Sequence, residues 1–371
     1  MRGAIVRPVV IAAGGTGGHF FPAEALAAEL VRRGRRVALM TDTRAAKNPS
    51  AAFVGREQFV LSGAGIAGRG IGRAAMALGT LAAGTWQARE ILARIDAAAI
   101  VGFGGYPSVA PVLATRLLRH RPAVLLHEQN AVLGRANRML SRFADRLALS
   151  HANTQRVPAG VPTQLTGNPV RPPIAALAGG GYAPPAVEIR LLILGGSLGA
   201  RVFSEVVPPA LERLSEALRI RLHVTQQCRA EDLDGVSSAY ARSGIAAELA
   251  PFFADISTLL RNAHLVIARA GASTVAELGV AGRPAILVPL PGAIDDHQTA
   301  NARSLADVGG AWMIPQSGFG AEALVRQLEK ILAEPELLRT AAANAAACGH
   351  ADAAARLADL VEAHVAQEST L

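Results

Sequence analysis

The chain has 371 residues, of which 51% are hydrophobic and 18% are charged, which excludes a disordered protein and predicts two domains of ordinary size. Its net charge of +8 favours anionic partners such as nucleotides, nucleic acid or an acidic membrane surface, unless it reflects an arginine-rich composition alone. No stretch has the ~20 continuous apolar residues of a membrane-spanning helix. Cys228 and Cys348 lack a metal-binding spacing and suit a reducing compartment. We therefore expect a cytoplasmic protein, and this expectation is compatible with binding to the surface of a membrane.

The first half of the chain alternates short β-rich runs with longer helical patterns. Strands are predicted over 6–13, 35–41, 97–102, 122–127 and 146–150, and helices over 22–34, 70–95, 107–119 and 131–143. Continuous apolar strands that are separated by helices predict a parallel sheet with both faces covered. A first doubly wound domain follows from this pattern.

The segment 165–188 is rich in proline and glycine, and we interpret it as the connection between two domains. The alternation then restarts, with strands predicted over 189–194, 219–226, 246–249, 264–268, 285–289 and 311–314, helices over 199–217, 254–262, 272–281, 296–308 and 319–333, and one or two helices in 335–367. Two consecutive α/β domains predict a ligand cleft at the carboxyl ends of their strands.

Three glycine turns follow predicted strands: GGTGGH (14–19), GFGGYPS (102–108) and GGSLGA (195–200). Glycine allows close backbone approach, and N–H groups at a helix start favour a phosphate. None of the turns matches G-x-G-x-x-G or carries a Walker lysine, so a single one is equally compatible with a plain tight turn. His19 ends the first turn, before a helix expected near Pro22. Its imidazole is a candidate to accept a proton or to bind an anion, or it is a histidine satisfied locally.

The densest polar stretch is 268–302. Ser273 and Thr274 lie at a predicted helix start, and Glu277 follows either as a helix cap or as an acceptor for ribose hydroxyls. Elsewhere, HEQN (127–130) ends a strand. Metal binding by its histidine and glutamate is disfavoured, because neighbouring strand residues point to opposite faces. Its Asn130 is left as either a helix cap or a ligand for a sugar.

Seven motifs occur in order across nearly the whole chain: GGTGGHFFPA, GFGGYPS, HEQNAVLGRANR, TGNPVR, GGSLGA, RAGASTVAEL and DDHQTANA. Together they closely resemble the MurG family, within glycosyltransferase family 28. The resemblance implies a GT-B fold, with two Rossmann-like doubly wound parallel-sheet domains facing across a cleft. It implies a membrane-facing acceptor domain over 1–166, a linker over 167–187, a UDP-GlcNAc domain over 188–348, and a helix over 349–371 that returns to the first domain.

The activity implied by the resemblance is inverting transfer of GlcNAc from UDP-GlcNAc to the C4 hydroxyl of lipid I, undecaprenyl-diphosphate-MurNAc-pentapeptide, which gives lipid II for peptidoglycan. His19 becomes the first candidate for the base, with phosphate binding as its alternative. The implied substrate-binding residues are Thr16, Gly17 and Gly18 for donor sugar and diphosphate, Asn130 for the sugar, Arg171 and Ser197 for diphosphate, Phe253 for uracil, Ser273, Thr274 and Glu277 for phosphate and ribose, and Gln298 for GlcNAc hydroxyls. The acceptor-side candidates are Gly104, Gly105, Tyr106 and Glu128. Leu198 departs from the family pattern, where glutamine is usual, and this change bears on donor affinity.

The resemblance also bears on partners. It implies no required cofactor, with a divalent cation at most a stimulant and no metal held by the protein, in line with the lack of a D-x-D motif at the glycine turns. A membrane-borne acceptor implies a peripheral enzyme on the anionic cytoplasmic face of the inner membrane, without nucleic acid, in reach of other envelope-synthesis proteins. The basic and apolar residues that suit this face are Arg69, Arg73, Ile71, Met76, Leu78, Leu81, Trp86, Arg135, Arg138 and Arg142. An ordinary core helix is the alternative for 69–89.

Three other functions remain open from the sequence. A GT-B transferase with another lipid acceptor, such as diacylglycerol, would share the scaffold. A UDP-GlcNAc 2-epimerase would turn over UDP-GlcNAc without lipid, and a nucleotide-sugar sensor would bind it without releasing UDP.

Overall fold

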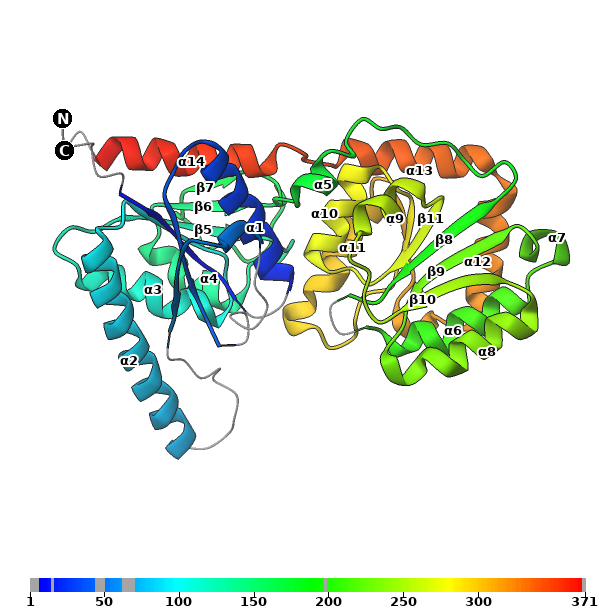
Figure 1. The fold of residues 1–371 in the computed structure, drawn as a ribbon, viewed down its shortest axis with the longest axis horizontal. Coiled ribbons are helices and arrows are strands. Elements are labelled where there is room, and N and C mark those ends of the chain that lie inside the picture. The colour runs from blue at the N-terminus through cyan, green and yellow to red at the C-terminus, as the bar shows by residue number, and fades with distance from the viewer. Residues whose placement is uncertain (1–6, 15–16, 44–50, 62–70, 197–198, 369–371) are drawn as a thin grey trace. The chain divides into compact units, whose positions relative to one another are not determined.

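The structure, a computed structural model, describes residues 7–14, 17–43, 51–61, 71–196 and 199–368. The chain divides into two compact units, unit 1 with residues 1–171 and 352–371, and unit 2 with residues 172–351 (Figure 1). The predicted linker, 167–187, spans the point where the chain passes from unit 1 to unit 2. Thr16, Ser197 and Leu198 lie outside the described residues, as does Arg69.

Unit 1 is built on a parallel sheet whose strand order is β3-β2-β1-β4-β5-β6-β7. The strands are β1 (Val9–Ala12), β2 (Val37–Thr41), β3 (Glu57–Val60), β4 (Ala99–Gly102), β5 (Ala123–Glu128), β6 (Arg146–Leu149) and β7 (Thr163–Leu165). The chain starts at the centre, moves outward to β3 and then reverses to β4. In such sheets ligands bind beyond the carboxyl ends of the strands at this reversal, here between β1 and β4.

Helices cover both faces of this sheet, which explains why β1 is buried along its whole length. The helices are α1 (Gly17–Arg32), α2 (Ile71–Ile95), α3 (Val109–Ala114), α4 (Arg135–Leu140) and α14 (Ala353–Glu368). One apolar core joins α1 and α14 to the sheet, and a second joins α2, α3 and α4 to its other face.

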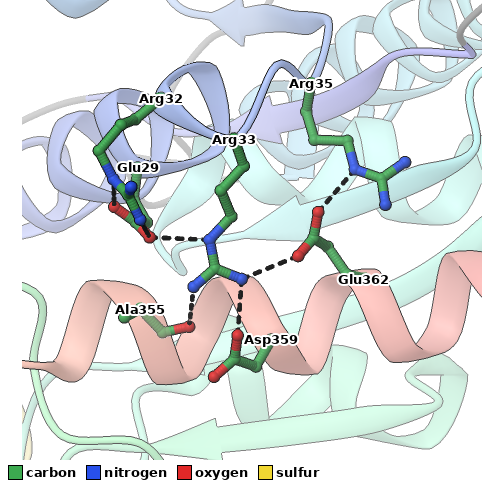
Figure 2. A network of polar contacts seen from close by, with 7 residues as sticks. All are labelled: Glu29, Arg32, Arg33, Arg35, Ala355, Asp359 and Glu362. Carbon is green, nitrogen blue, oxygen red and sulfur yellow. Dashed lines mark hydrogen bonds and ion pairs between the residues drawn. The ribbon is translucent and has the colours of Figure 1, made fainter.

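The last described helix, α14, is tied by ion pairs to the turn that follows α1 (Figure 2). The Arg33 guanidinium reaches Asp359 at 2.6 Å and Glu362 at 2.8 Å, while its Nε donates to Glu29 at 2.7 Å. Arg35 donates to Glu362 at 2.6 Å. The side chains of Arg33 and Glu362 are only 18% and 25% exposed, so their pair is less screened by water than an ordinary surface pair.

Apolar side chains fill the space beneath these ion pairs. Leu357 and Val361 of α14 are fully buried and share one core cluster with Leu26 and Leu30 of α1. Burying a leucine or valine side chain stabilises a fold by roughly 1.5–3 kcal/mol. Helix α14 is therefore part of the core of unit 1.

Unit 2 contains a second parallel sheet, in the order β10-β9-β8-β11-β12-β13. Its strands are β8 (Ile189–Leu194), β9 (Leu222–Gln227), β10 (Ala246–Ala250), β11 (Leu265–Ala268), β12 (Ala285–Leu287) and β13 (Ala311–Met313). Its helices are α5 (Pro172–Ala175), α6 (Arg201–Glu212), α7 (Glu216–Arg219), α8 (Leu233–Ser243), α9 (Ile256–Asn262), α10 (Ala272–Ala281), α11 (His297–Ala306), α12 (Ala321–Ala333) and α13 (Pro335–Ala347). Here the chain reverses between β8 and β11.

Most predicted elements are confirmed, including the parallel sheets in both halves, but several details were wrong, among them the short helices α5 and α7, which were not predicted. Strands β3 and β7 were not predicted because these edge strands are largely exposed and lack an apolar run. Helix α8 was missed because only Val236 and Tyr240 give it a buried stripe. Helix α1 begins at Gly17 instead of near Pro22, since two glycines weakened its pattern. His19 therefore lies in the first turn of the helix.

Candidate active site

In unit 1, His19 lies at the reversal between β1 and β4. The first glycine turn connects β1 to this histidine. The histidine faces the second glycine turn, where Gly104 and Gly105 have φ angles of 78° and 64°. A Cβ atom on Gly105 would lie 3.8 Å from Nε2 of His19. Glycine at this position therefore provides the left-handed backbone and leaves room beside that ring nitrogen. Tyr106 follows in a short 3-10 helix.

The opposite ring nitrogen of His19 contacts the protein. Its Nδ1 lies 3.0 Å from the carbonyl oxygen of Phe103 and 2.9 Å from Oε1 of Gln129. Gln129 is 1% exposed and its amide nitrogen contacts Nδ1 of His127 at 3.0 Å. Nε2 of His127 in turn lies 3.0 Å from the carbonyl oxygen of Gly167. Four segments of unit 1 thus meet through two histidines and one glutamine.

Burial of His127 lowers the pKa of its imidazole to about 4, and the hydrogen bond to Gly167 counteracts this only in part. The ring is therefore neutral at physiological pH. Because both of its nitrogens are engaged within the protein, it has no lone pair left for a metal ion.

Glu128 organises the loop that follows β5. Its side chain is 2% exposed, and each carboxylate oxygen accepts two N–H groups. Oε1 accepts from the backbone and side-chain nitrogens of Asn130, at 3.1 and 3.0 Å. Oε2 accepts from the Gly134 backbone and the Asn137 side chain, both at 2.9 Å. These contacts favour a positioning role for Glu128, while its contact with an acceptor stays a prediction.

Two further sequence predictions in unit 1 fall near α1. Gly17 and Gly18 are the first residues of this helix, where backbone N–H groups have no acceptor within the helix. The guanidinium of Arg171 lies 4.5 Å from the ring centroid of Phe21, one turn further along. The end of the TGNPVR motif and the start of α1 are therefore neighbours.

In unit 2, the turn after β8 is held by a residue that sequence reasoning missed. Gln227, the last residue of β9, accepts a hydrogen bond from Gly195 N and donates to the carbonyl oxygens of Gly196 and Pro251, each at 3.1 Å. Position 195 requires glycine, because a Cβ there would lie 2.4 Å from the backbone nitrogen of Ala200. The only available signal was a polar residue at the end of a strand.

Helix α10 brings the predicted phosphate and ribose residues together. Its N-cap is Gly271, without a side-chain cap, and Glu277 is six positions further on, so capping does not explain that glutamate. The Ser273 hydroxyl is buried and finds no hydrogen-bond partner in the described part of the chain. Buried polar groups are normally paired, and a ligand oxygen would satisfy this one. Thr274 lies beside it in the first turn.

The remaining predicted residues of unit 2 follow two different strands of its sheet, β10 and β12. Phe253 is buried after β10, beside the 71%-exposed Phe252. Gln298, in the first turn of α11, accepts a hydrogen bond from Leu290 N at 2.9 Å and fixes the loop after β12. Arg269, which sequence reasoning also missed, is buried and donates to the carbonyl oxygens of that loop, at 3.1 and 3.2 Å. Burial lowers the pKa of its guanidinium.

Family models match both units. The glycosyltransferase family 28 N-terminal domain matches residues 9–149, and the family 28 C-terminal domain matches residues 190–357. A relative from Granulibacter bethesdensis is 63% identical over 96% of this chain and 93% of its own length. Its name is UDP-N-acetylglucosamine–N-acetylmuramyl-(pentapeptide) pyrophosphoryl-undecaprenol N-acetylglucosamine transferase. The chain belongs to the MurG family of glycosyltransferases.

Solved structures agree with this family. The crystal structure of MurG from Acinetobacter baumannii superposes with a TM-score of 0.77 at 32% identity, covering 96% of this chain and 99% of that one. The calicheamicin glycosyltransferase CalG4 superposes with a TM-score of 0.65 over 99% of both chains, but at 17% identity it shows the fold alone. The chain is a hexosyltransferase with the GT-B architecture of two Rossmann-like domains.

Among the described residues, no helix is long and apolar enough to cross a membrane.

Proposed function

We propose that this MurG-family chain transfers GlcNAc from UDP-GlcNAc to the C4 hydroxyl of MurNAc in lipid I, with inversion, to form lipid II. The observation that carries the proposal is its extensive identity to relatives that are named for this transfer. Two features of the units support it: a histidine whose Nε2 lies beside Gly105 in unit 1, and a helix start in unit 2 where the buried Ser273 hydroxyl finds no partner among the described residues.

The reaction needs a base for the attacking hydroxyl and charge stabilisation for departing UDP. His19 takes the proton as the C4 oxygen bonds to C1 of GlcNAc, and the bond from C1 to the diphosphate oxygen breaks. Arg171 and the N–H groups at the start of α6 stabilise the diphosphate. This scheme requires no cofactor, and a divalent cation acts at most as a stimulant.

Donor binding is assigned to unit 2. The Ser273 hydroxyl and Thr274 bind phosphate at the start of α10, and Glu277 accepts hydrogen bonds from the ribose hydroxyls. Phe253 lies next to the uracil, and Gln298 contacts the GlcNAc hydroxyls. The glycine turn after β8 contributes backbone N–H groups, in a site completed by Ser197. In unit 1, Thr16 and Asn130 complete the contacts to the sugar.

Release of UDP tests this function. We expect release from UDP-GlcNAc only when a lipid I analogue is present, with a lipid II analogue as the second product. Consumption of UDP-GlcNAc without lipid would instead indicate an epimerase. Release only with diacylglycerol would indicate another acceptor, and tight binding without release would indicate a sensor.

We also propose that unit 1 binds the anionic cytoplasmic membrane surface through α2. The first half of this helix extends beyond the sheet (Figure 1), and Met76, Leu78 and Trp86 are 71%, 67% and 56% exposed. Arg135 and Arg142 lie in or beside α4, on the same face of the sheet. An apolar tip with flanking arginines suits an interfacial helix.

Flotation with vesicles tests this surface. Vesicles that contain anionic phosphatidylglycerol should carry the protein, and a Met76→Ser, Leu78→Ser variant should remain behind with its circular dichroism unchanged. Equal flotation of the two proteins would argue against α2 as the contact.

A further inference from the structure

Gln129 connects the candidate base to a buried histidine, and its amide has one orientation. Its nitrogen lies 3.1 Å from the backbone carbonyl oxygen of His127, which only accepts hydrogen bonds. The amide oxygen must then be the atom that faces His19, at 2.9 Å.

This orientation fixes the hydrogen on both histidines. Nδ1 of His19 faces two acceptors, the oxygens of Phe103 and Gln129, so it must carry the hydrogen. Nδ1 of His127 accepts from the amide nitrogen of Gln129, and Nε2 of His127 donates to Gly167 O. The two rings therefore hold opposite tautomers.

In its neutral form His19 then has its lone pair on Nε2. That nitrogen is the one beside Gly105, where the absence of a side chain leaves space. We infer that Gln129 is a positioning residue which, oriented by His127, holds His19 as the Nδ1–H tautomer and thereby makes Nε2 the atom that takes the proton. The inference rests on the proposed function of His19 as base.

A positioning role differs from ordinary structural support in what it changes. Loss of the Gln129 oxygen removes one of two acceptors at Nδ1, so the ring gains access to the wrong tautomer and to rotation. The fraction of enzyme that is competent for proton transfer falls, while the donor site in unit 2 is untouched. We therefore expect loss of the Gln129 oxygen to lower kcat and to change the tautomer of His19, while the KM for UDP-GlcNAc stays the same.

The test compares Gln129→Met with Gln226→Met. Both glutamines are buried at strand ends, but Gln226 bonds the Tyr240 hydroxyl in the core of unit 2. Relative to this control, Gln129→Met should lower kcat roughly tenfold, the equivalent of one lost hydrogen bond. Its KM for UDP-GlcNAc should stay within about twofold of the control. Equal kcat values for the two variants would overturn the positioning role.

Nitrogen-15 NMR of histidine-labelled protein at pH 8 reads the tautomers directly and needs no activity. His19 should show a protonated Nδ1 and His127 a protonated Nε2, with assignments from His19→Ala and His127→Asn. In Gln129→Met, the His19 signals should move toward the other tautomer. An Nε2–H form of His19 in the unaltered protein would overturn the inference. If lipid-dependent UDP release is absent but these tautomers are found, the proposed function fails while the positioning by Gln129 stands.

Discussion

The two units surround the turns after their first strands with different kinds of hydrogen bond. In unit 1, side chains that hydrogen-bond one another lie around His19 and the end of β5: Gln129 contacts His19 and His127, and Glu128 accepts from Asn137. In unit 2, the side-chain amide of Gln227 fixes the turn after β8 by bonding main-chain atoms. The same strand–turn–helix connection thus contains a histidine held by side chains in one unit and a turn fixed at its main chain in the other, and we propose a proton acceptor in the first and an anion site in the second.

The sharpest way to break this comparison is to remove the side chain that distinguishes unit 1. His19→Ala should lower kcat by about 10²–10⁴-fold, the usual contribution of a general base. Donor affinity should remain within about threefold, because the proposed nucleotide contacts are in unit 2. UDP release measures the first quantity and calorimetric titration of UDP-GlcNAc the second. A loss of affinity with normal turnover would make His19 a phosphate ligand.

A second test uses pH, because the buried polar network of unit 1 contains a neutral histidine. His127 has a pKa of about 4 in the folded protein against about 6.5 when unfolded, so the unfolded chain binds the proton first as pH falls. The contribution of neutral His127 to the free energy of unfolding is therefore fully present above pH 6.5. About 3 kcal/mol of that free energy is lost by pH 4.

Urea unfolding of the protein and of His127→Gln measures this difference. His264 in unit 2 also has a lowered pKa from burial, so the comparison with the variant isolates the contribution of His127. The variant should lose less stability between pH 7 and pH 4. Parallel curves for the two proteins would contradict the assignment.

A third test distorts the backbone of the glycine turn after β8 in unit 2. Gly195→Ala places a Cβ against the Ala200 backbone nitrogen and should weaken UDP-GlcNAc binding by roughly tenfold or more, because overpacking costs about 1–3 kcal/mol. Gly235→Ala is the matched control, since nothing lies within 4 Å of its added Cβ. Calorimetric titration of both variants separates them, and equal affinities would remove the turn from the donor site.

The smallest expected effect comes from the ion pairs that tie α14 to the turn after the helix bearing His19. Arg33→Met should destabilise the protein by about 1–2 kcal/mol, because it removes a partner from Glu362, whose side chain is only 25% exposed. Arg32→Met should change stability very little, since Arg32 is exposed and its ion pair within the described part of the chain is with Glu29, on the same helix. Thermal unfolding measures both variants, and equal midpoints would show that the ion pairs contribute nothing.

Local patterns predicted much of this molecule and its family, but few of its long-range contacts. Buried strands such as β1 are recognisable in the sequence as apolar runs, and the ordered motifs pointed to His19 and Ser273. The link between His19 and Gln129 joins residues 110 positions apart, so no local pattern predicts it. Arg269 has the same difficulty, because two of its hydrogen bonds go to main-chain carbonyl oxygens that any residue supplies, and a third goes to Gln316, 47 positions away.

The place of α14 in unit 1 has a consequence for biosynthesis. Leu357 and Val361 complete the core around α1, yet they leave the ribosome only after all of unit 2 has been translated. At ordinary rates of about 5–20 residues per second, roughly 10–40 s separate the end of the first segment from the arrival of this helix. During that interval the nascent chain has an uncovered apolar face beside α1, which is where we expect chaperones to bind and aggregation to begin.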